Sequence, residues 1–445
     1  MRDLVILASI IGLVPFILRH AWIGVLAWTW IGLMNPHLYS WRSASFPVAM
    51  VIGGSTLLSL LYSKDKRGVA MSGPIVLMGV LLLFFTIKTP FAWNQPEAWW
   101  QWDKVFKIYL MTFVTTMLIY GEKRIHALVL TIIVSLGFYG VKGGLFTLAT
   151  GGSYRVEAPE GSFIGGNTQL GLALVMLLPL YLAFSQVTRY KWVRLGCWGA
   201  FWLSMVAIVF TYSRGALIGL ASVSIPLWLM TKRRVLALIV AIPAIAAGFS
   251  FAPDKLINRA GTIGTYEQDL SAMQRIQAWS VARNIAIENP VLGAGFNLDY
   301  MPYSTWITYS DPEFYGPGFH LVRAAHSVYF QMLGEHGFMG LGLYAIMVLC
   351  TYITLNRTRV LARRDPQLFW AGRYAAALMA SILGFLTAGA FLSLAYFDLL
   401  YVYVALAAIL RREVAERVER KVTPSDAHAK ALPARSARPS NVLTK

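Results

Sequence analysis

The sequence predicts an all-α polytopic membrane protein with about 12 to 13 transmembrane helices and one large helical loop outside the membrane. Of the 445 residues, 57% are hydrophobic and only 13% are charged, whereas soluble domains carry about 25% charged residues. The mean hydropathy is +0.57. Apolar runs long enough to cross ~30 Å of hydrocarbon recur along nearly the whole chain, and one long polar interruption, residues 253–325, breaks the series.

The apolar runs place the individual spans. The first two are short and are interrupted by Pro15 and Pro36, so we expect one of them to be a partial span. No small-residue cleavage site follows the first run, which indicates an anchor rather than a cleavable signal peptide. An odd number of spans would put the two termini on opposite sides of the membrane. The predicted spans are 4–18, 22–35, 46–62, 73–87, 105–120, 128–148, 169–184, 195–211, 216–230, 235–251, 338–355, 370–391 and 394–410.

The net charge of +18 is distributed in a way that argues against nucleic-acid binding. Lysine and arginine cluster in short loops between the spans, as the positive-inside rule predicts for cytoplasmic loops. The opposite loops, 88–104, 150–168, 213–215, 253–325 and a turn near Ser393, are then external. Four tryptophans between Trp93 and Trp102 are typical of an interfacial belt. The basic loops are 64–67, 123–124, 189–194, 232–234, 357–364 and the segment from 411 onward.

Four regions follow from this topology: an N-terminal transmembrane bundle (1–252), a large external loop (253–326), C-terminal transmembrane helices (327–410) and a basic tail (411–445). The tail contains three prolines among alanines and serines, so we expect it to be disordered and cytoplasmic. Within the loop, residues 271–289 have helical spacing, with Met273, Ile276 and Val281 on one side. Pro290 ends this helix, and a glycine-rich turn follows. Cys197 and Cys350 are too isolated for a disulfide framework, and we expect packing roles.

Arg214 and His326 are the strongest candidates for chemistry. Arg214 lies between two closely spaced spans at the external interface, where positive charge is disfavoured and where a guanidinium suits the recognition of phosphate. His326 lies where the external loop re-enters the membrane, and a histidine there is either structural or a general base. Taken alone, Arg275, Arg283 and Arg323 are expected to be solvated charges.

Metal binding is weakly supported by the sequence. His320 and His336 are six and ten residues from His326, which does not match one helical face. Asp311 and Glu313 flank a proline and favour a turn over a divalent-metal pair. Asp398 lies inside the last predicted span and is a functional candidate by its position, without a partner that the sequence identifies.

These residues carry a family resemblance. The segments that match are Thr211-Tyr-Ser-Arg214-Gly-Ala, Arg275 with Trp279, Pro290-Val-Leu-Gly-Ala-Gly295-Phe, His326-Ser with Glu335 and Gly337, and Asn167 in Gly-Gly-Asn-Thr. With this order and spacing the chain resembles the O-antigen ligase and polymerase superfamily over roughly residues 167–355. The N-terminal stretch from Trp28 to Trp41 looks like the subgroup of exosortase-associated O-glycosylation ligases. One departure is Ser327, where the family often has asparagine.

The resemblance implies a GT-C-like glycosyltransferase architecture in a bacterial inner membrane, with a cytoplasmic C-terminus and a periplasmic site. The donor would be an undecaprenyl-diphosphate-linked glycan and the acceptor lipid A-core, with no metal or other cofactor. His326 would be the general base, and Arg214 and Arg275 would hold the diphosphate. Asn167, Arg323 and Glu335 are expected to support them. The long loop would close over the site.

Three other functions remain open at this point. A protein O-oligosaccharyltransferase and a glycan polymerase would share the donor site and differ in the acceptor. A transporter or flippase is an alternative from another class, with Arg214 and His326 along a substrate path. It predicts discontinuous spans and charges near mid-membrane, whereas the candidate charges here lie at the external edge.

Overall fold

A computed structural model describes residues 2–39, 46–231, 270–316 and 318–430. Regular structure in these ranges is helical, with one isolated β-bridge between Ala158 and Gly166. The α-helices and short 3-10 helices (η) are α1 Arg2–Arg19, α2 Ala21–Met34, η1 Pro36–Tyr39, α3 Val48–Tyr62, α4 Gly73–Lys88, η3 Thr89–Phe91, α5 Gln95–Leu118, α6 Gly121–Thr150, α7 Asn167–Val187, α8 Lys191–Val209, α9 Arg214–Met230, α12 Leu270–Glu288, η5 Leu298–Tyr300, α13 Tyr303–Thr308, η6 Pro312–Phe314, α14 Val328–Ala362, η7 Pro366–Leu368, α15 Phe369–Ala388, η8 Gly389–Phe391 and α16 Asp398–Lys430.

The chain is an all-α polytopic membrane protein, as the sequence predicts. Every predicted span that lies within the described residues overlaps a helix, whereas the predicted span 235–251 lies outside them. Three apolar helices, α2, α3 and α9, are shorter than the others, and the number of complete spans stays a prediction. Six helical stretches in the described part of the chain are long and apolar enough to cross a membrane: Gly73–Phe91, Gly121–Thr150, Asn167–Val187, Lys191–Val209, Val328–Ala362 and Pro366–Phe391.

Helix α7 is the centre of the bundle. It is apolar on all sides, as expected for a helix surrounded by other helices, and it packs against α6, α8, α9 and α15. Pro179 removes one amide donor inside the helix. In the same part of the helix, hydroxyls of Ser381 and Tyr403 donate to the Met176 carbonyl at 2.5 and 3.1 Å, whereas the carbonyl that the missing amide would have bonded is that of Val175. Neighbouring helices thus supply hydrogen bonds where lipid cannot.

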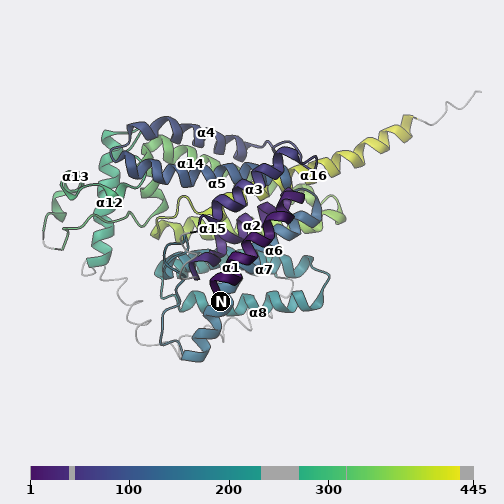
Figure 1. Cartoon of the computed structure of the whole chain (residues 1–445), viewed down its shortest axis with the longest axis horizontal. Coiled ribbons are helices and arrows are strands. Elements are labelled where there is room, and N and C mark those ends of the chain that lie inside the picture. The colour runs from purple at the N-terminus through teal and green to yellow at the C-terminus, as the bar shows by residue number, and fades with distance from the viewer. Residues whose placement is uncertain (1, 40–45, 232–269, 317, 431–445) are drawn as a thin grey trace, which may run out of the picture.

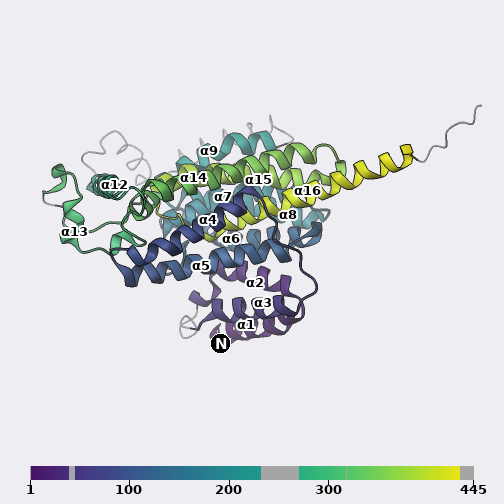
Figure 2. The same cartoon turned by 90° about the horizontal axis from the view of Figure 1, so that it is seen from above.

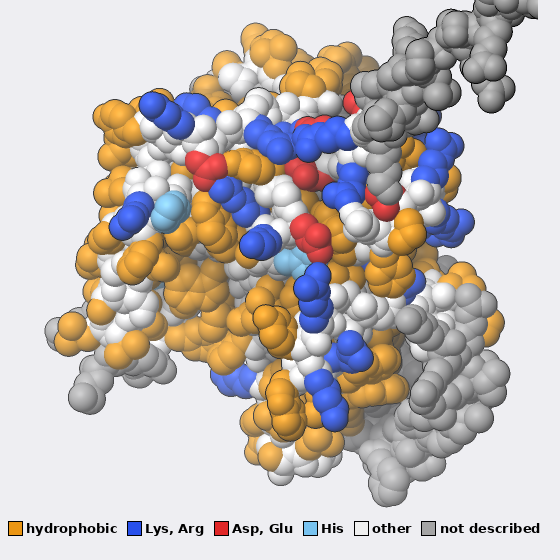
Figure 3. All heavy atoms as spheres, turned by 90° about the vertical axis from the view of Figure 1, so that its right-hand side faces the viewer, with side chains coloured by type: hydrophobic (Ala, Val, Ile, Leu, Met, Phe, Trp, Pro, Cys, Tyr) orange, Lys and Arg blue, Asp and Glu red, His pale blue; other side chains and the backbone are white. Residues whose placement is uncertain are grey.

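The two ends of the bundle differ in character. At one end α12 lies across the ends of α4, α5 and α14, together with the short helix α13 (Figure 1). In the perpendicular view α12 is seen end-on at the same end (Figure 2). Helix α16 emerges from the opposite end, and that face carries many more lysine and arginine side chains than acidic ones (Figure 3). The basic loops and the large polar loop are therefore segregated to opposite ends.

The predicted helix in the large loop is confirmed as α12, Leu270–Glu288. Val281 is buried as expected, whereas Met273 and Ile276 are only partly buried. Ile285, Ala286 and Gln277 are buried as well. Helix α12 packs against α14. Residues 253–269 of the loop lie outside the described residues.

Two segments differ from the expectation. Helix α5 already begins at Gln95, so most of the tryptophan-rich segment is helical rather than loop. The tail, predicted to be disordered from Arg411, continues α16 as far as Lys430. The acidic residues of this segment contribute to its order, because the carboxylates of Glu413 and Glu416 pair with the guanidinium of Arg67 at 3.2 and 3.1 Å. Residues 431–445 lie outside the described ranges.

Candidate active site

His326 lies in the two-residue link between the external loop and α14. Its backbone is left-handed, with φ +44°, a conformation that costs a residue with a side chain ~1–3 kcal/mol and often marks a functional position. Trp279 of α12 fixes the peptide before it, because its Nε1 donates to the Ala325 carbonyl at 2.6 Å. The same indole stacks on Phe330, with ring centroids 5.0 Å apart. Helix α12 thus holds the chain on both sides of His326.

The electrostatic environment keeps His326 neutral. Burial lowers its pKa to about 4, and the positive charges of Arg275 and Arg323 lower it in the same direction. The structure thus brings together three of the predicted site residues, one from α12 and two from the end of the loop. A neutral imidazole at neutral pH has a free lone pair and can accept a proton.

Arg214 is the first residue of α9. The preceding turn is tight: Tyr212 has φ +54°, and Ser213 caps the helix by accepting from the Ala216 amide at 3.2 Å. Asn167, at the start of α7, donates to the Thr211 carbonyl at 2.8 Å. The structure therefore brings Asn167 and Arg214 to the same end of the bundle, and it gives Asn167 a role in holding the Arg214 turn.

Arg214 and His326 are linked through η8. A Cβ placed on Gly215 would lie 3.1 Å from the Phe391 side chain, and one placed on Gly389 would lie 3.1 Å from the Val328 side chain. The starts of α9 and α14 therefore both pack against this 3-10 turn. Arg214 directly precedes Gly215 in the sequence, and His326 precedes Val328 by two residues. His326 is thus flanked by Arg275 and Arg323 on the loop side and by the α9 turn beyond η8.

Helix α14 is interrupted at Gly337, whose φ of +64° and ψ of −172° are not helical. The break frees the carbonyls of Gly334 and Glu335, which accept from the amides of Ala294 and Gly295 at 2.9 and 3.0 Å. In return, the amide of Phe338 donates to the Pro290 carbonyl at 2.8 Å.

The glycine-rich turn after α12 is therefore docked into a broken transmembrane helix. A Cβ on Gly293 would lie 2.6 Å from the Gly334 carbonyl oxygen, and one on Gly337 would lie 2.4 Å from that of Pro290. Since real Cβ atoms do not approach backbone so closely, both positions require glycine. This docking explains why Pro290 and Gly295 lie so close in the sequence, because the Pro290 carbonyl and the Gly295 amide both bond to the interrupted turn of α14.

A buried polar network lies beneath the docked turn. The ammonium of Lys88, at the end of α4, donates to the carbonyls of Leu292 and Glu335, the former at 2.7 Å. It also contacts His336 Nδ1 at 2.5 Å, and His336 Nε2 lies 2.5 Å from the Tyr396 hydroxyl. Tyr396 in turn donates to the Glu335 carboxylate. Assigning Nδ1 of His336 as acceptor and Nε2 as donor gives every group in this chain a partner.

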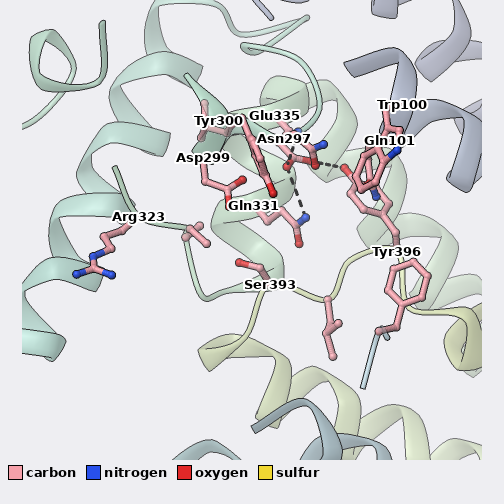
Figure 4. A pocket seen from close by; sticks show the side chains of 15 residues that line it. Trp100, Gln101, Asn297, Asp299, Tyr300, Arg323, Gln331, Glu335, Ser393 and Tyr396 are labelled. Atoms are coloured by element: carbon pink, nitrogen blue, oxygen red, sulfur yellow. Dashed lines mark hydrogen bonds between the residues drawn. The ribbon is translucent and has the colours of Figure 1, made fainter. Parts of the chain in front are cut away.

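A cavity of about 210 Å³ opens beside this network. Glu335 and Tyr396 reach it from the network, Gln331 reaches it from α14, and Arg323 to Ala325 form its wall next to His326. Figure 4 shows Glu335 at the centre of three hydrogen bonds, whereas the guanidinium of Arg323 lies apart from it, on the other side of the cavity. The other lining residues are Trp100, Gln101, Phe163, Asn297, Leu298, Asp299, Tyr300, Ser393 and Leu394.

Sequence reasoning missed most of this network and cavity. Lys88 was assigned only as the start of an external loop, and His336 was set aside because its spacing from His326 fits no helical face. The sequence does show a lysine at the end of an apolar run, and a lysine at such a position needs hydrogen-bond acceptors nearby if it is buried. Gln331, Tyr396 and Asn297 have no such signal, because only the tertiary fold brings them together.

Arg283 and Asp311 are partners of each other, whereas Asp398 Oδ1 has no hydrogen-bond partner among the described residues. Arg283 donates two hydrogen bonds to the Asp311 carboxylate, at 2.9 and 3.0 Å, and Asp311 precedes η6. The predicted turn at Asp311 to Glu313 is confirmed. Asp398 is partly buried at the start of α16, where its carboxylate faces Gly32 of α2. In the described ranges no three histidine, cysteine or acidic side chains gather as a metal would require.

The fold and the site define a class: a polytopic helical membrane protein with its reactive groups gathered at one end of the bundle, under a loop. Residues 199–345 match a family model described as O-Antigen ligase. This match supports membership of the chain in the O-antigen ligase superfamily, in agreement with the resemblance, and supports an activity of the ligase or polymerase type. Residues 1–188 match a second model, a Family of unknown function (DUF5935). No curated protein matches the chain.

Proposed function

We propose that this protein is an inner-membrane O-antigen ligase that transfers a glycan from undecaprenyl diphosphate to lipid A-core at the periplasmic face. The observation that carries the proposal is the neutral His326 beside Arg275 and Arg323, under the loop and next to the Arg214 turn. A base and several cations at a membrane edge suit a hydroxyl acceptor and an anionic, lipid-linked donor.

The reaction is a single displacement. A hydroxyl of the acceptor attacks the anomeric carbon of the donor glycan, and a new glycosidic C–O bond forms as the bond to the diphosphate oxygen breaks. The hydroxyl proton passes to the imidazole of His326, and the bonding electrons leave with the diphosphate. Because attack comes from the face opposite the leaving group, the anomeric configuration inverts.

Arg214 and Arg275 would hold the diphosphate and stabilise the negative charge that develops on it. Guanidinium groups bind phosphate oxygens through paired, charge-assisted hydrogen bonds, and such donors stabilise a leaving anion most strongly in a site shielded from water. The bound diphosphate has a second effect. Its negative charge offsets that of Arg275 and Arg323, which raises the pKa of His326 from about 4 toward neutrality. Donor binding thus makes the imidazole a better base.

Reconstitution with purified lipid-linked glycan and lipid A-core tests the proposal. We expect the wild type to join them in the presence of EDTA and the His326→Ala and Arg214→Ala variants to lose at least ~10²-fold in rate, as for removal of a general base or of a charge-stabilising donor. Arg155→Ala is a matched control, since Arg155 is an exposed arginine paired with Glu157. Unchanged transfer by His326→Ala would contradict the role of the base.

The acceptor is tested in the same system. Transfer to a peptide hydroxyl instead of lipid A-core would identify a protein O-oligosaccharyltransferase, and extension of the glycan itself would identify a polymerase. A requirement for Mg²⁺ or Mn²⁺ would contradict the arginine-only charge stabilisation proposed here.

A further inference from the structure

We propose that the cavity beside His326 is a saccharide subsite that holds the acceptor sugar carrying the attacking hydroxyl. The identity of that sugar rests on the ligase function proposed above, whereas the binding of a sugar ring rests on the cavity itself. Its volume of about 210 Å³ is far above the ~10–15 Å³ that one bound water requires.

The chemistry of the lining suits a sugar ring. Amide side chains at Gln101, Asn297 and Gln331 offer both donors and acceptors, and the aromatic rings of Trp100, Tyr300 and Phe163 offer apolar faces. A pyranose presents the same combination, with hydroxyls around its edge and C–H groups on its faces. The three amides can bind neutral hydroxyls, and they carry no net charge that would favour an anion.

The polar groups are held in place before any ligand binds. Gln331 Nε2 donates to the Glu335 carboxylate at 3.5 Å, and its Oε1 accepts from the Ala395 amide at 3.1 Å. The same carboxylate accepts from the backbone amide of Asn297 at 3.2 Å, and the side-chain Nδ2 of Asn297 donates to the Glu97 carbonyl at 3.3 Å. Side chains fixed in this way lose little rotational freedom when a ligand binds.

One buried group in the wall is unsatisfied. Ser393 Oγ is shielded from solvent and has no hydrogen-bond partner among the described residues. A buried hydroxyl without a partner costs ~1–3 kcal/mol, and in native proteins it calls for an explanation. Other buried polar atoms among the described residues share this property, so Ser393 adds a polar group to the wall and does not by itself identify an occupant.

The position of the cavity favours the acceptor over the donor. Its wall includes Arg323, Ala324 and Ala325, directly before His326, and Trp100 at the start of α5. Helix α9, which begins at Arg214, lies on the other side of α14 and α15 from α4 and α5 (Figure 2). His326 therefore stands between the cavity and the Arg214 turn. An acceptor hydroxyl in the cavity would thus lie beside the base, with the diphosphate of the donor toward the Arg214 turn.

Two measurements test the subsite. The first is saturation-transfer NMR of the wild type with a core oligosaccharide freed from lipid A by mild acid, without donor. The second is the KM for lipid A-core and for the donor in the transfer reaction. The variants are Trp100→Ala and Gln331→Ala, with Trp100→Phe as the conservative replacement. Trp192→Ala is the matched control, because Trp192 is an exposed tryptophan at the start of α8.

We expect Trp100→Ala and Gln331→Ala to raise the KM for the acceptor about tenfold and to weaken the NMR signal, with the donor KM unchanged. Trp100→Phe should recover most of the affinity, and Trp192→Ala should match the wild type. Unchanged acceptor binding in both variants would overturn the subsite. A raised KM for the donor alone would overturn its assignment to the acceptor. If the wild type shows no transfer, the ligase proposal fails, and the NMR arm still decides whether the cavity binds a saccharide.

Discussion

His326 combines three properties that seldom coincide in a structural histidine. Its backbone is left-handed, burial and two arginines keep its imidazole neutral, and the loop holds it where α14 begins. Arg275, one of the two arginines that lower the pKa of His326, is also proposed to bind the anionic donor. Binding of the anionic donor would therefore raise the pKa of His326.

This coupling predicts a pH dependence. Arg275 disfavours the protonated imidazole, so its removal in Arg275→Gln should raise the pKa of His326 above about 4. Because transfer requires neutral His326, the acid limb of the kcat/KM profile should move to higher pH, whatever the height of the plateau. The profile of Arg155→Gln should overlay the acid limb of the wild type. An unmoved limb in Arg275→Gln would contradict the pairing.

The buried Lys88 predicts a loss of stability. In Lys88→Met the carbonyls of Leu292 and Glu335 lose their donor, and each orphaned buried acceptor costs ~1–3 kcal/mol. We expect the free energy of unfolding to fall by about 3 kcal/mol, seen as a lower midpoint of thermal unfolding in detergent. Lys107→Met should change it by no more than ~0.5 kcal/mol, since Lys107 forms only an exposed pair with Asp103. Equal midpoints for the two variants would refute the role of Lys88.

At the scale of elements, the broken helix α14 is the central feature. Its first segment, before Gly337, is bonded to the loop through Ala294 and Gly295, and its second segment continues across the bundle. A continuous helix would satisfy its own carbonyls and leave the loop without a dock. The interruption converts a transmembrane helix into a support for the loop.

Gly337→Ala should therefore be strongly destabilising. The left-handed backbone costs ~1–2 kcal/mol with a side chain, and the new Cβ would collide with the Pro290 carbonyl. We expect a lower unfolding midpoint and a large loss of transfer. Gly342→Ala lies in the same helix with open space around it, and it should be neutral or stabilising by up to ~1 kcal/mol. Equal unfolding midpoints for Gly337→Ala and Gly342→Ala would contradict the structural role of Gly337.

The sequence predicted the helices well and the site only in outline. Apolar runs locate the spans because lipid allows few other structures, and α12 was predicted from its spacing and the following Pro290. Arg214 and His326 stood out because each is polar at a membrane boundary. Gln331, Asn297 and Tyr396 could not be predicted as one cluster, since they belong to distant segments. The helical tail after Arg411 was missed because its pairing with Arg67 is also tertiary.

At the scale of the molecule, the separation of the two ends predicts the topology. Basic loops and α16 lie at one end, and α12, α13 and the candidate site lie at the other. By the positive-inside rule we expect the first end to face the cytoplasm. We expect Tyr315→Cys, in a Cys197→Ala, Cys350→Ala background, to react with an impermeant maleimide in intact spheroplasts. Arg420→Cys should react only after permeabilisation. The reverse pattern would invert the topology and contradict a periplasmic site.

Lys88 also bears on how this chain can be recombined with others. It belongs to the N-terminal region, 1–188, whereas Leu292, Glu335 and His336 belong to the region 199–345. Among the contacts between the two regions, the Lys88 ammonium provides the hydrogen bonds at the point where the loop docks. A chimera that exchanges only one region keeps either Lys88 or its carbonyl acceptors. The loop then docks correctly only if the residue at the end of α4 can donate to those acceptors. In proteins that combine these two regions, the regions should therefore be exchanged as a pair rather than separately.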